Sequence, residues 1–263
     1  MNCLIKLNQV SFCYSTHKIV QNLDLCIERE SIMSIMGPSG CGKSTLLRLI
    51  SGLELPSLGY ISFDGEAVSY PPKDLRYSFQ DYDAFPWLTV EENVLLSNKS
   101  LKRKDALSQT NDILKRVGLY DHRKKYPAQL SGGMRKRLAL GRCIAGASKA
   151  ILLDEPFSSL DVDARNDLHN LVLTLAKQIK CTFLIVTHDI EEAIFLSSKV
   201  VIATQLPFQI RAIVEIPFPY PRTEALLLLP EFQIISKRIR GLLIQHSSEM
   251  GRILGDRENI NDA

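Results

Sequence analysis

The segment GPSGCGKST, residues 37–45, combines three glycines with a lysine and three hydroxyl side chains at fixed spacing. It matches G-x-x-x-x-G-K-[ST] in full, the pattern of a phosphate-binding loop (P-loop). Glycines let backbone N–H groups turn toward phosphate oxygens, and a helix that begins there adds partial positive charge. We expect Lys43 to reach the β- and γ-phosphates of a nucleotide and the Ser44 hydroxyl to hold Mg²⁺. The predicted nucleotide contacts are Gly37, Pro38, Ser39, Gly40, Cys41, Gly42, Lys43, Ser44 and Thr45.

A second chemical pattern is AILLDE, residues 150–155, an apolar run that ends in two carboxylates. With a P-loop upstream, Asp154 suits a Mg²⁺ ligand and Glu155 suits a general base that polarises the attacking water. Carboxylates at a strand end also cap helices or face solvent. The P-loop makes the catalytic interpretation the better one.

The segment LSGGMRKR, residues 130–137, places two glycines directly before a basic, helix-like run. Ordering glycine costs more conformational entropy than ordering any other residue. The segment is therefore either a loose loop or a place where the backbone comes close to an anion. Ser131 is a suitable N-cap for the helix that follows.

Alternating strands and helices position these residues. Buried strands are predicted over 31–37, 150–155 and 182–188, and helices over 43–51 and 164–179. Such alternation predicts an α/β fold with a mainly parallel sheet. The first strands and a hairpin over 60–68, turning at Asp64-Gly65, predict an antiparallel part. The pattern is helical from about residue 87 to 146, and a further helix follows Pro230.

Several motifs together resemble the ATPase subunit of ABC transporters, in that family's order and over nearly the whole chain. They are the P-loop, Gln80 at the Q-loop position, LSGGM as the signature motif, and the AILLDE carboxylates. SSLD at 158–161 resembles the D-loop, and His188 in VTHD resembles the switch histidine. Tyr14 fits the aromatic position that stacks on adenine. The resemblance implies a P-loop NTPase fold with an N-terminal antiparallel β subdomain and a helical insert that carries the signature.

The predicted domains are a nucleotide-binding core formed by residues 1–86 and 147–220, a helical insert at 87–146 and a helical tail at 221–263. The resemblance further implies a head-to-tail dimer with ATP between the two copies. Each P-loop would face the other copy's Ser131, Gly132 and Gly133, with Asp161 also at the interface. Within one copy, Gln80 and His188 would assist Glu155, and Gln80 would join Ser44 and Asp154 at Mg²⁺.

Taken singly, several of these residues have ordinary alternatives. Gln80 could be a polar loop residue, His188 a surface histidine and Tyr14 a packing residue. Asp161 could merely cap the helix over 164–179, and we expect it to do so besides contacting the other copy. Two positions depart from the family pattern: Met134 stands where the signature usually ends in Gln, and Gly141 stands inside the signature helix where Ala is usual. A thioether accepts hydrogen bonds weakly, so a side-chain contact from Met134 to nucleotide is in doubt.

Two segments indicate which branch of the family this chain resembles. FPWLTVEENV at 85–94 and PYPRTE at 219–224 resemble the nitrate, sulfonate and taurine importer branch. The branch implies import of a small oxyanion through a membrane permease, with a solute-binding protein outside. Trp87 could instead be a core residue of the insert. A thiamine-precursor pyrimidine importer and a soluble ABC ATPase without transport remain alternatives.

The composition limits which partners, membrane location and cysteine chemistry we expect. The net charge of +3 is too small to indicate a nucleic-acid partner. No apolar run approaches the roughly 20 residues that span a bilayer, so we expect the chain not to cross a membrane by itself. The resemblance implies a peripheral subunit on the cytoplasmic face of the inner membrane. The six cysteines form no CxxC pair, and we expect free thiols without a disulfide framework or zinc site.

Overall fold

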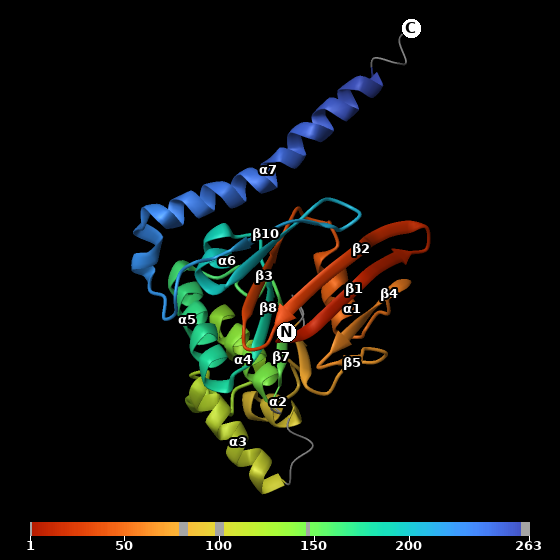
Figure 1. The fold of residues 1–263 in the computed structure, drawn as a ribbon. Coiled ribbons are helices and arrows are strands. Elements are labelled where there is room, and N and C mark those ends of the chain that lie inside the picture. The colour runs from red at the N-terminus through yellow and green to blue at the C-terminus, as the bar shows by residue number, and fades with distance from the viewer. Residues whose placement is uncertain (1, 79–83, 98–102, 146–147, 259–263) are drawn as a thin grey trace.

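The computed structural model describes residues 2–78, 84–97, 103–145 and 148–258, and side chains as far as residue 244. A six-stranded sheet forms its centre, in the order β10–β9–β3–β8–β7–β6 (Figure 1). Its strands are β3 (Ile32–Met36), β6 (Leu75–Ser78), β7 (Ala150–Asp154), β8 (Thr182–Val186), β9 (Lys199–Ala203) and β10 (Ile210–Glu215). All neighbours pair in parallel except β9 and β10, so the predicted mainly parallel core is confirmed.

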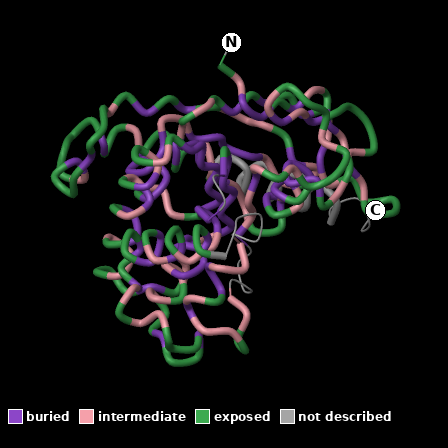
Figure 2. Tube along the Cα trace, turned by 90° about the horizontal axis from the view of Figure 1, so that it is seen from below, coloured by how far each residue is buried: buried purple, intermediate pink, exposed green. Residues whose placement is uncertain are grey.

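The central strands are buried along their whole length. Every residue of β3, β7 and β8 is buried, and Figure 2 shows buried residues, in purple, gathered toward the centre of the molecule. Strands covered on both faces have no polar face, which explains why the sequence shows continuous apolar runs instead of alternation. Functional side chains on these strands must therefore lie where the strands end.

A second sheet is antiparallel, in the order β2–β1–β4–β5. It consists of β1 (Cys3–Tyr14), β2 (His17–Glu28), β4 (Leu58–Phe63) and β5 (Glu66–Ala67). The predicted hairpin turns at Asp64 and Gly65, whose φ angles of 54° and 86° are both positive. Two positive φ angles define the hairpin turn that matches strand twist, and Asp and Gly adopt them readily. The antiparallel part predicted for the N-terminal region is confirmed.

Helices occupy the predicted positions. Helix α1 (Lys43–Ile50) follows β3, and α2 (Val90–Ser97), α3 (Arg103–Arg116) and α4 (Gly132–Ile144) lie between β6 and β7 in the chain. These three helices contact one another. Helices α5 (Val162–Ile179) and α6 (Ile190–Leu196) follow β7 and β8. Short 3-10 turns are η1 (Tyr120–His122), η2 (Pro127–Gln129) and η3 (Glu224–Leu228).

The C-terminal helix α7 (Pro230–Glu258) begins at the predicted proline and extends away from the body of the molecule (Figure 1). Its first half packs on the core through Phe232 and Ile239, which are fully buried, and it contacts α6. Just before it, the buried guanidinium of Arg222 donates to the carbonyls of Ile194 and Ser197 at the end of α6. The PYPRTE segment thus closes the C-terminal end of α6.

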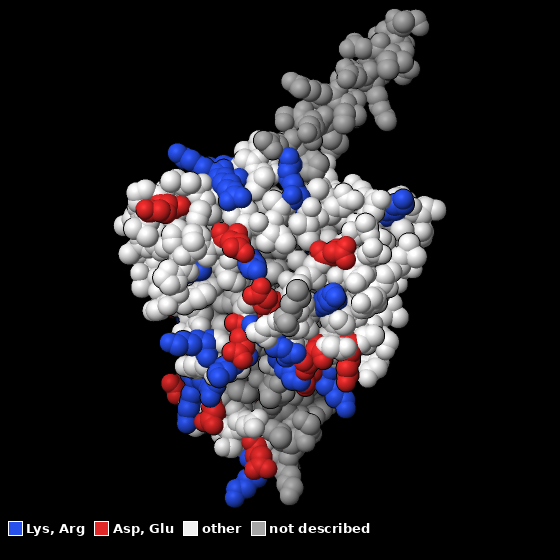
Figure 3. All heavy atoms as spheres, viewed as in Figure 1, with Lys and Arg blue, Asp and Glu red and all other residues white. Residues whose placement is uncertain are grey.

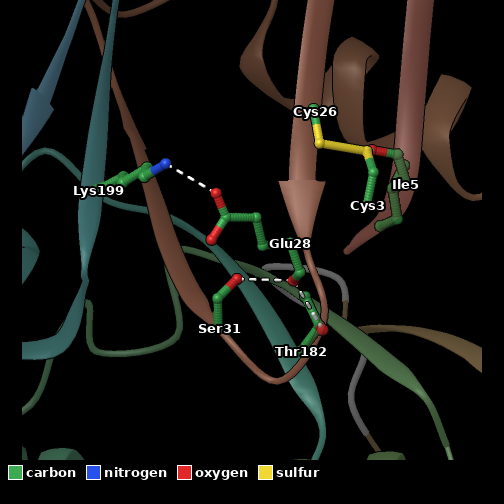
Figure 4. The surroundings of a disulfide bond; sticks show 7 residues. All are labelled: Cys3, Ile5, Cys26, Glu28, Ser31, Thr182 and Lys199. Carbon is green, nitrogen blue, oxygen red and sulfur yellow. Dashed lines mark hydrogen bonds and ion pairs between the residues drawn. A yellow bond between two sulfur atoms is a disulfide. The ribbon is translucent and has the colours of Figure 1, made fainter. Parts of the chain in front are cut away.

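The expectation that all six cysteines are free thiols is wrong. Cys3 on β1 and Cys26 on β2 form a disulfide, with their Cα atoms 5.8 Å apart (Figure 4). Antiparallel pairing of the two strands brings these distant positions together, which no local spacing could indicate. The other four cysteines are free thiols, as expected: Cys13, Cys41, Cys143 and Cys181.

Glu28, at the end of β2, joins the two sheets (Figure 4). Its carboxylate pairs with Lys199 of β9 at 2.8 Å, and its carbonyl accepts a hydrogen bond from the Thr182 hydroxyl of β8 at 3.1 Å. The antiparallel sheet is therefore held to the parallel core near the start of β3. The P-loop follows the other end of β3.

Candidate nucleotide-binding site

The order of the parallel strands gathers the predicted site residues at one edge of the sheet. Strand β8 lies between β3 and β7, and β6 follows β7. The carboxyl ends of parallel strands meet at the same edge, which is where open α/β sheets bind ligands. Gly37 therefore follows β3, His188 lies just beyond β8, and Asp154 ends β7 with Glu155 next to it.

The P-loop forms a tight turn between β3 and α1. Gly42 has a φ of 102° and is the N-cap of α1, without a side-chain capping bond. A Cβ atom at Gly42 would also lie only 3.0 Å from the Ile19 side chain. The first N–H groups of α1 have no partner within the helix, so they are available to an anion. Glycine is required here for both conformational and steric reasons.

Lys43 is folded back over this turn. Its ammonium group donates to the carbonyls of Gly37 and Pro38 at 2.9 and 2.8 Å, and its side chain is mostly buried. Cys41 is buried beside it, and burial raises the pKa of the thiol against the opposing effect of Lys43. Cys41 thus fills space within the loop as a neutral thiol.

Asp154 is a buried carboxylate at the end of β7, with an exposed fraction of 6%. It accepts a hydrogen bond from the Tyr77 hydroxyl of β6 at 3.1 Å. Burial, followed by the charge of Asp154, raises the pKa of Tyr77, so this hydroxyl remains a donor at neutral pH. Sequence reasoning missed Tyr77, because nothing in its local sequence indicates that β6 lies beside β7.

Glu155 and His188 meet at the sheet edge. The Nδ1 atom of His188 lies 3.7 Å from the Oε1 atom of Glu155, and the imidazole is 70% exposed. Glu155 has a φ of 47°, in the left-handed region that residues other than glycine rarely adopt. Its N–H donates to the carbonyl of Val186, and its carbonyl accepts from the Ser158 hydroxyl at 2.9 Å. Both bonds fix the backbone of Glu155 just before the D-loop.

The signature segment begins helix α4. Ser131 is its N-cap and accepts a hydrogen bond from the Met134 N–H at 3.2 Å, as predicted. Gly132 and Gly133 form the first helical turn, and a Cβ atom at Gly133 would lie 3.3 Å from the Cβ of Ala164 on α5. The glycines therefore allow α4 to approach the helix of the D-loop closely.

Asp161 is the N-cap of α5 and accepts a hydrogen bond from the Ala164 N–H at 2.8 Å. The predicted capping role of Asp161 is confirmed. Because the first turns of α4 and α5 lie against each other, the signature segment and the D-loop belong to one continuous surface.

Two predicted residues lie apart from this group, and a third, Gln80, lies outside the described residues. The Tyr14 hydroxyl donates to Glu54 at 3.3 Å, beyond the C-terminal end of α1, whereas the P-loop precedes its N-terminus. Trp87 is 69% exposed, so its interpretation as a core residue of the insert is wrong.

Comparison with known proteins agrees with this geometry. A family model described as "ABC transporter" matches residues 20–158. The chain belongs to the ABC transporter family. It is an ABC ATPase, which binds ATP and couples ATP hydrolysis to transport. The P-loop, the AILLDE carboxylates and the signature segment all lie within the matched range.

Individual relatives resemble the ABC ATPase over most of its length. An aliphatic sulfonates import ATP-binding protein, SsuB of Bacillus cereus, is 38% identical over 239 residues, covering 89% of this chain and 94% of that protein. A bicarbonate transport ATP-binding protein, CmpC of Synechococcus elongatus, is 40% identical over 208 residues, or 77% of this chain and 31% of that protein.

A solved structure has the same fold. The dimeric post-hydrolysis state of the ATP-binding cassette MJ0796, bound to ADP and Pi, aligns with a TM-score of 0.72 and 26% identity. The alignment covers 82% of this chain and all of that one. The P-loop NTPase fold predicted for the ABC ATPase is therefore confirmed.

The face of the ABC ATPase shown in Figure 3 carries Lys and Arg interspersed with Asp and Glu. Interspersed charges give no extended field of one sign on this face. Among the described residues, none of the helices is both long and apolar enough to cross a membrane.

Proposed function

We propose that this ABC ATPase energises the import of a small oxyanion, of which a sulfonate is the leading candidate. The observation that carries the proposal is the approach of Glu155 to His188 beside a complete P-loop, which is an arrangement suited to ATP hydrolysis. The relatives named for sulfonate and bicarbonate transport support an anionic solute. The solute itself would contact the permease and a solute-binding protein, not this subunit.

In the proposed site, residues 37–45 cradle the phosphates through backbone N–H groups and the start of α1. Lys43 leaves the carbonyls of Gly37 and Pro38 and reaches the β- and γ-phosphates. In this exchange the ammonium group of Lys43 loses two neutral carbonyl acceptors and gains an anionic phosphate, which attracts the positive charge more strongly. Tyr14 is proposed to contact the adenine, which requires its ring to turn away from Glu54.

The residues at the sheet edge fit Mg²⁺. Asp154 is a buried carboxylate at the end of β7, and Mg²⁺ is a hard cation that binds oxygen ligands such as carboxylates. Ser44, Gln80 and Asp154 would hold the ion. Bound there, Mg²⁺ would neutralise charge on the β- and γ-phosphates.

Glu155 is proposed as the general base for the attacking water, and His188 as the group that holds the γ-phosphate and this water. Both side chains project beyond the ends of their strands, β7 and β8, with the P-loop strand β3 on the other side of β8. The carboxylate remains partly accessible, so a water molecule can reach it. Gln80 is proposed to assist the orientation of that water.

Two copies are proposed to act head to tail, with ATP between them. Ser131, Gly132, Gly133 and Asp161 would then face the partner copy's P-loop. Their placement on one surface, where α4 and α5 begin, supports this proposal. The partial positive charge at the start of α4 would face a γ-phosphate.

We further propose that residues 1–86 and 147–220 act as the nucleotide-binding core, residues 87–146 as a helical insert and residues 221–263 as a tail. The insert would receive the permease near Trp87, whose exposed ring lies 5.4 Å from that of Phe85. This contact would place the subunit peripherally on the cytoplasmic face of the membrane.

A deletion strain carrying the intact gene or its Glu155→Gln variant tests the transport function. Uptake is measured with labelled taurine or an alkanesulfonate, nitrate, bicarbonate and a thiamine-precursor pyrimidine. We expect the intact gene alone to restore uptake of one oxyanion. Restoration of only pyrimidine uptake would contradict the solute class, and equal restoration by the Glu155→Gln gene would contradict an energising role.

A further inference from the structure

A cluster of buried polar side chains lies behind His188, between α5 and α6. Thr187, His169 and Glu192 have exposed fractions of 2%, 7% and 7%. Burying ionisable groups is costly unless they are paired. None of them belongs to the site described above, so their burial requires another explanation.

Glu192 holds the turn that carries His188. The Thr187 hydroxyl donates to the Glu192 carboxylate at 2.5 Å, and the same hydroxyl accepts a hydrogen bond from the Asp189 N–H at 3.1 Å. These two bonds restrain the residues on both sides of His188. A charged acceptor makes the first bond one of the stronger kind.

The same cluster contacts the D-loop through Arg165 on α5. Its Nη2 atom donates to the carbonyl of Leu160 at 3.2 Å. Its Nη1 atom lies 3.7 Å from the Asp189 carboxylate, and its Nε atom lies 3.8 Å from that of Glu192. Arg165 therefore spans from the D-loop to the His188 turn.

His169 completes the connection. Its ring packs edge-on against Phe157 of the D-loop segment, with centroids 4.4 Å apart, and its Nε2 atom lies 3.7 Å from Glu192. A cavity of about 240 Å³ adjoins Arg165, His169 and Glu192. These ion pairs therefore lie beside open space and not within a closed core.

We propose that Glu192 and Arg165 are positioning residues that transmit the position of the D-loop to His188. The inference rests on the role proposed above for His188. The D-loop is the part of this connection that would contact a second copy, so the partner's approach would set the His188 turn. Neither side chain is proposed to touch the nucleotide.

The test measures steady-state ATP hydrolysis by the full chain, with its permease where turnover requires it. Glu192→Ala and Thr187→Val each remove the bond that holds the turn, and we expect kcat to fall by up to about 100-fold, with KM for ATP changed less than about twofold. Thr187→Ser and Glu192→Gln retain the hydroxyl or an acceptor, and we expect them to keep most of the turnover. Glu191→Ala, on the exposed side of α6, is the matched control.

A double variant separates positioning from general damage. In a His188→Ala background, Glu192→Ala should cause no further loss of kcat, because both changes remove the same interaction. If the losses of kcat from the two substitutions multiply, or if KM rises while kcat stays normal, the inference is overturned but the role proposed for His188 is not. Full turnover of His188→Ala would overturn the role proposed for His188 and the inference with it. If Glu192→Ala does not fold, Thr187→Val combined with His188→Ala gives the same comparison.

Discussion

His188 approaches Glu155 to 3.7 Å, although the two residues follow different strands, β8 and β7. Parallel pairing of these strands, with Asp154 opposite Val186, fixes their separation. The imidazole is largely exposed, whereas the backbone on either side of it is held by Thr187 and Glu192. An exposed side chain on a restrained turn can contact an incoming phosphate without a large rearrangement of the backbone.

The first prediction concerns Glu155. Glu155→Gln retains size and hydrogen bonding but removes the base, so ATP should still bind while turnover falls by about 100-fold or more. We also expect the variant to form a stable dimer in Mg·ATP, measured by light scattering after size exclusion. Lys43→Ala is the opposite control, since it should abolish nucleotide binding and dimer formation together. Wild-type turnover by Glu155→Gln would disprove the assigned base.

The second prediction concerns the exposed ring of Trp87. Trp87→Ala should reduce permease-stimulated ATPase activity by about tenfold, as expected for an aromatic anchor that a permease would cover, while the basal activity stays within twofold. Glu91→Ala should act in the same direction but less strongly. Glu91 forms an ion pair with the exposed Lys124 at 2.6 Å, and the loss of such a pair costs little free energy.

Leu228→Ala provides the control for Trp87, because Leu228 is 85% exposed and lies in η3, outside the insert. It should alter neither basal nor stimulated activity. Equal losses of both activities in Trp87→Ala would indicate a structural role for the ring instead of a docking role.

The third prediction concerns Gly141, inside helix α4. A Cβ atom there would lie 3.5 Å from Val117 and 3.6 Å from Ile113, which is ordinary van der Waals contact. Gly141→Ala should therefore raise the free energy of unfolding by about 0.5–1 kcal/mol, through helix propensity and reduced freedom of the unfolded chain. Gly37→Ala is the matched control and should destabilise the fold, since its Cβ would lie 2.9 Å from that of Ala203. A lower denaturation midpoint for Gly141→Ala would contradict this packing.

The fourth prediction concerns pH and Asp64. Lys149 and Arg29 both contact the Asp64 carboxylate and lower its pKa below the ordinary value of 3.8. Because the folded pKa is the lower one, the stabilisation is present above pH 3.8 and is lost as pH falls through the folded value. Asp64→Asn should thus lower the urea midpoint equally at pH 7 and pH 5, and the difference should shrink below about pH 4.

Asparagine tolerates the positive φ of residue 64, so this substitution leaves the turn intact. Asp112→Asn, at an exposed position of α3, should show no such effect. A difference between Asp64→Asn and the intact protein that persists unchanged to low pH would exclude the ion pairs as its source.

Short stretches of the sequence specified much of this protein. The P-loop, the carboxylate pair, the caps at Ser131 and Asp161 and the turn at Asp64-Gly65 each depend on a few consecutive residues. Their conformations follow from short-range sterics and hydrogen bonding, which a local pattern records. The apolar runs of β3, β7 and β8 likewise indicated buried parallel strands before their order was known.

Which of these pieces meet depends on the three-dimensional packing of the chain. The insertion of β8 between β3 and β7 brings His188 to Glu155, and the placement of β6 beside β7 brings Tyr77 to Asp154. Strand order, the Cys3–Cys26 bond and the burial of Glu192 all depend on contacts between residues far apart in the chain. Such contacts result from the packing of whole elements, and no spacing within a single element records them.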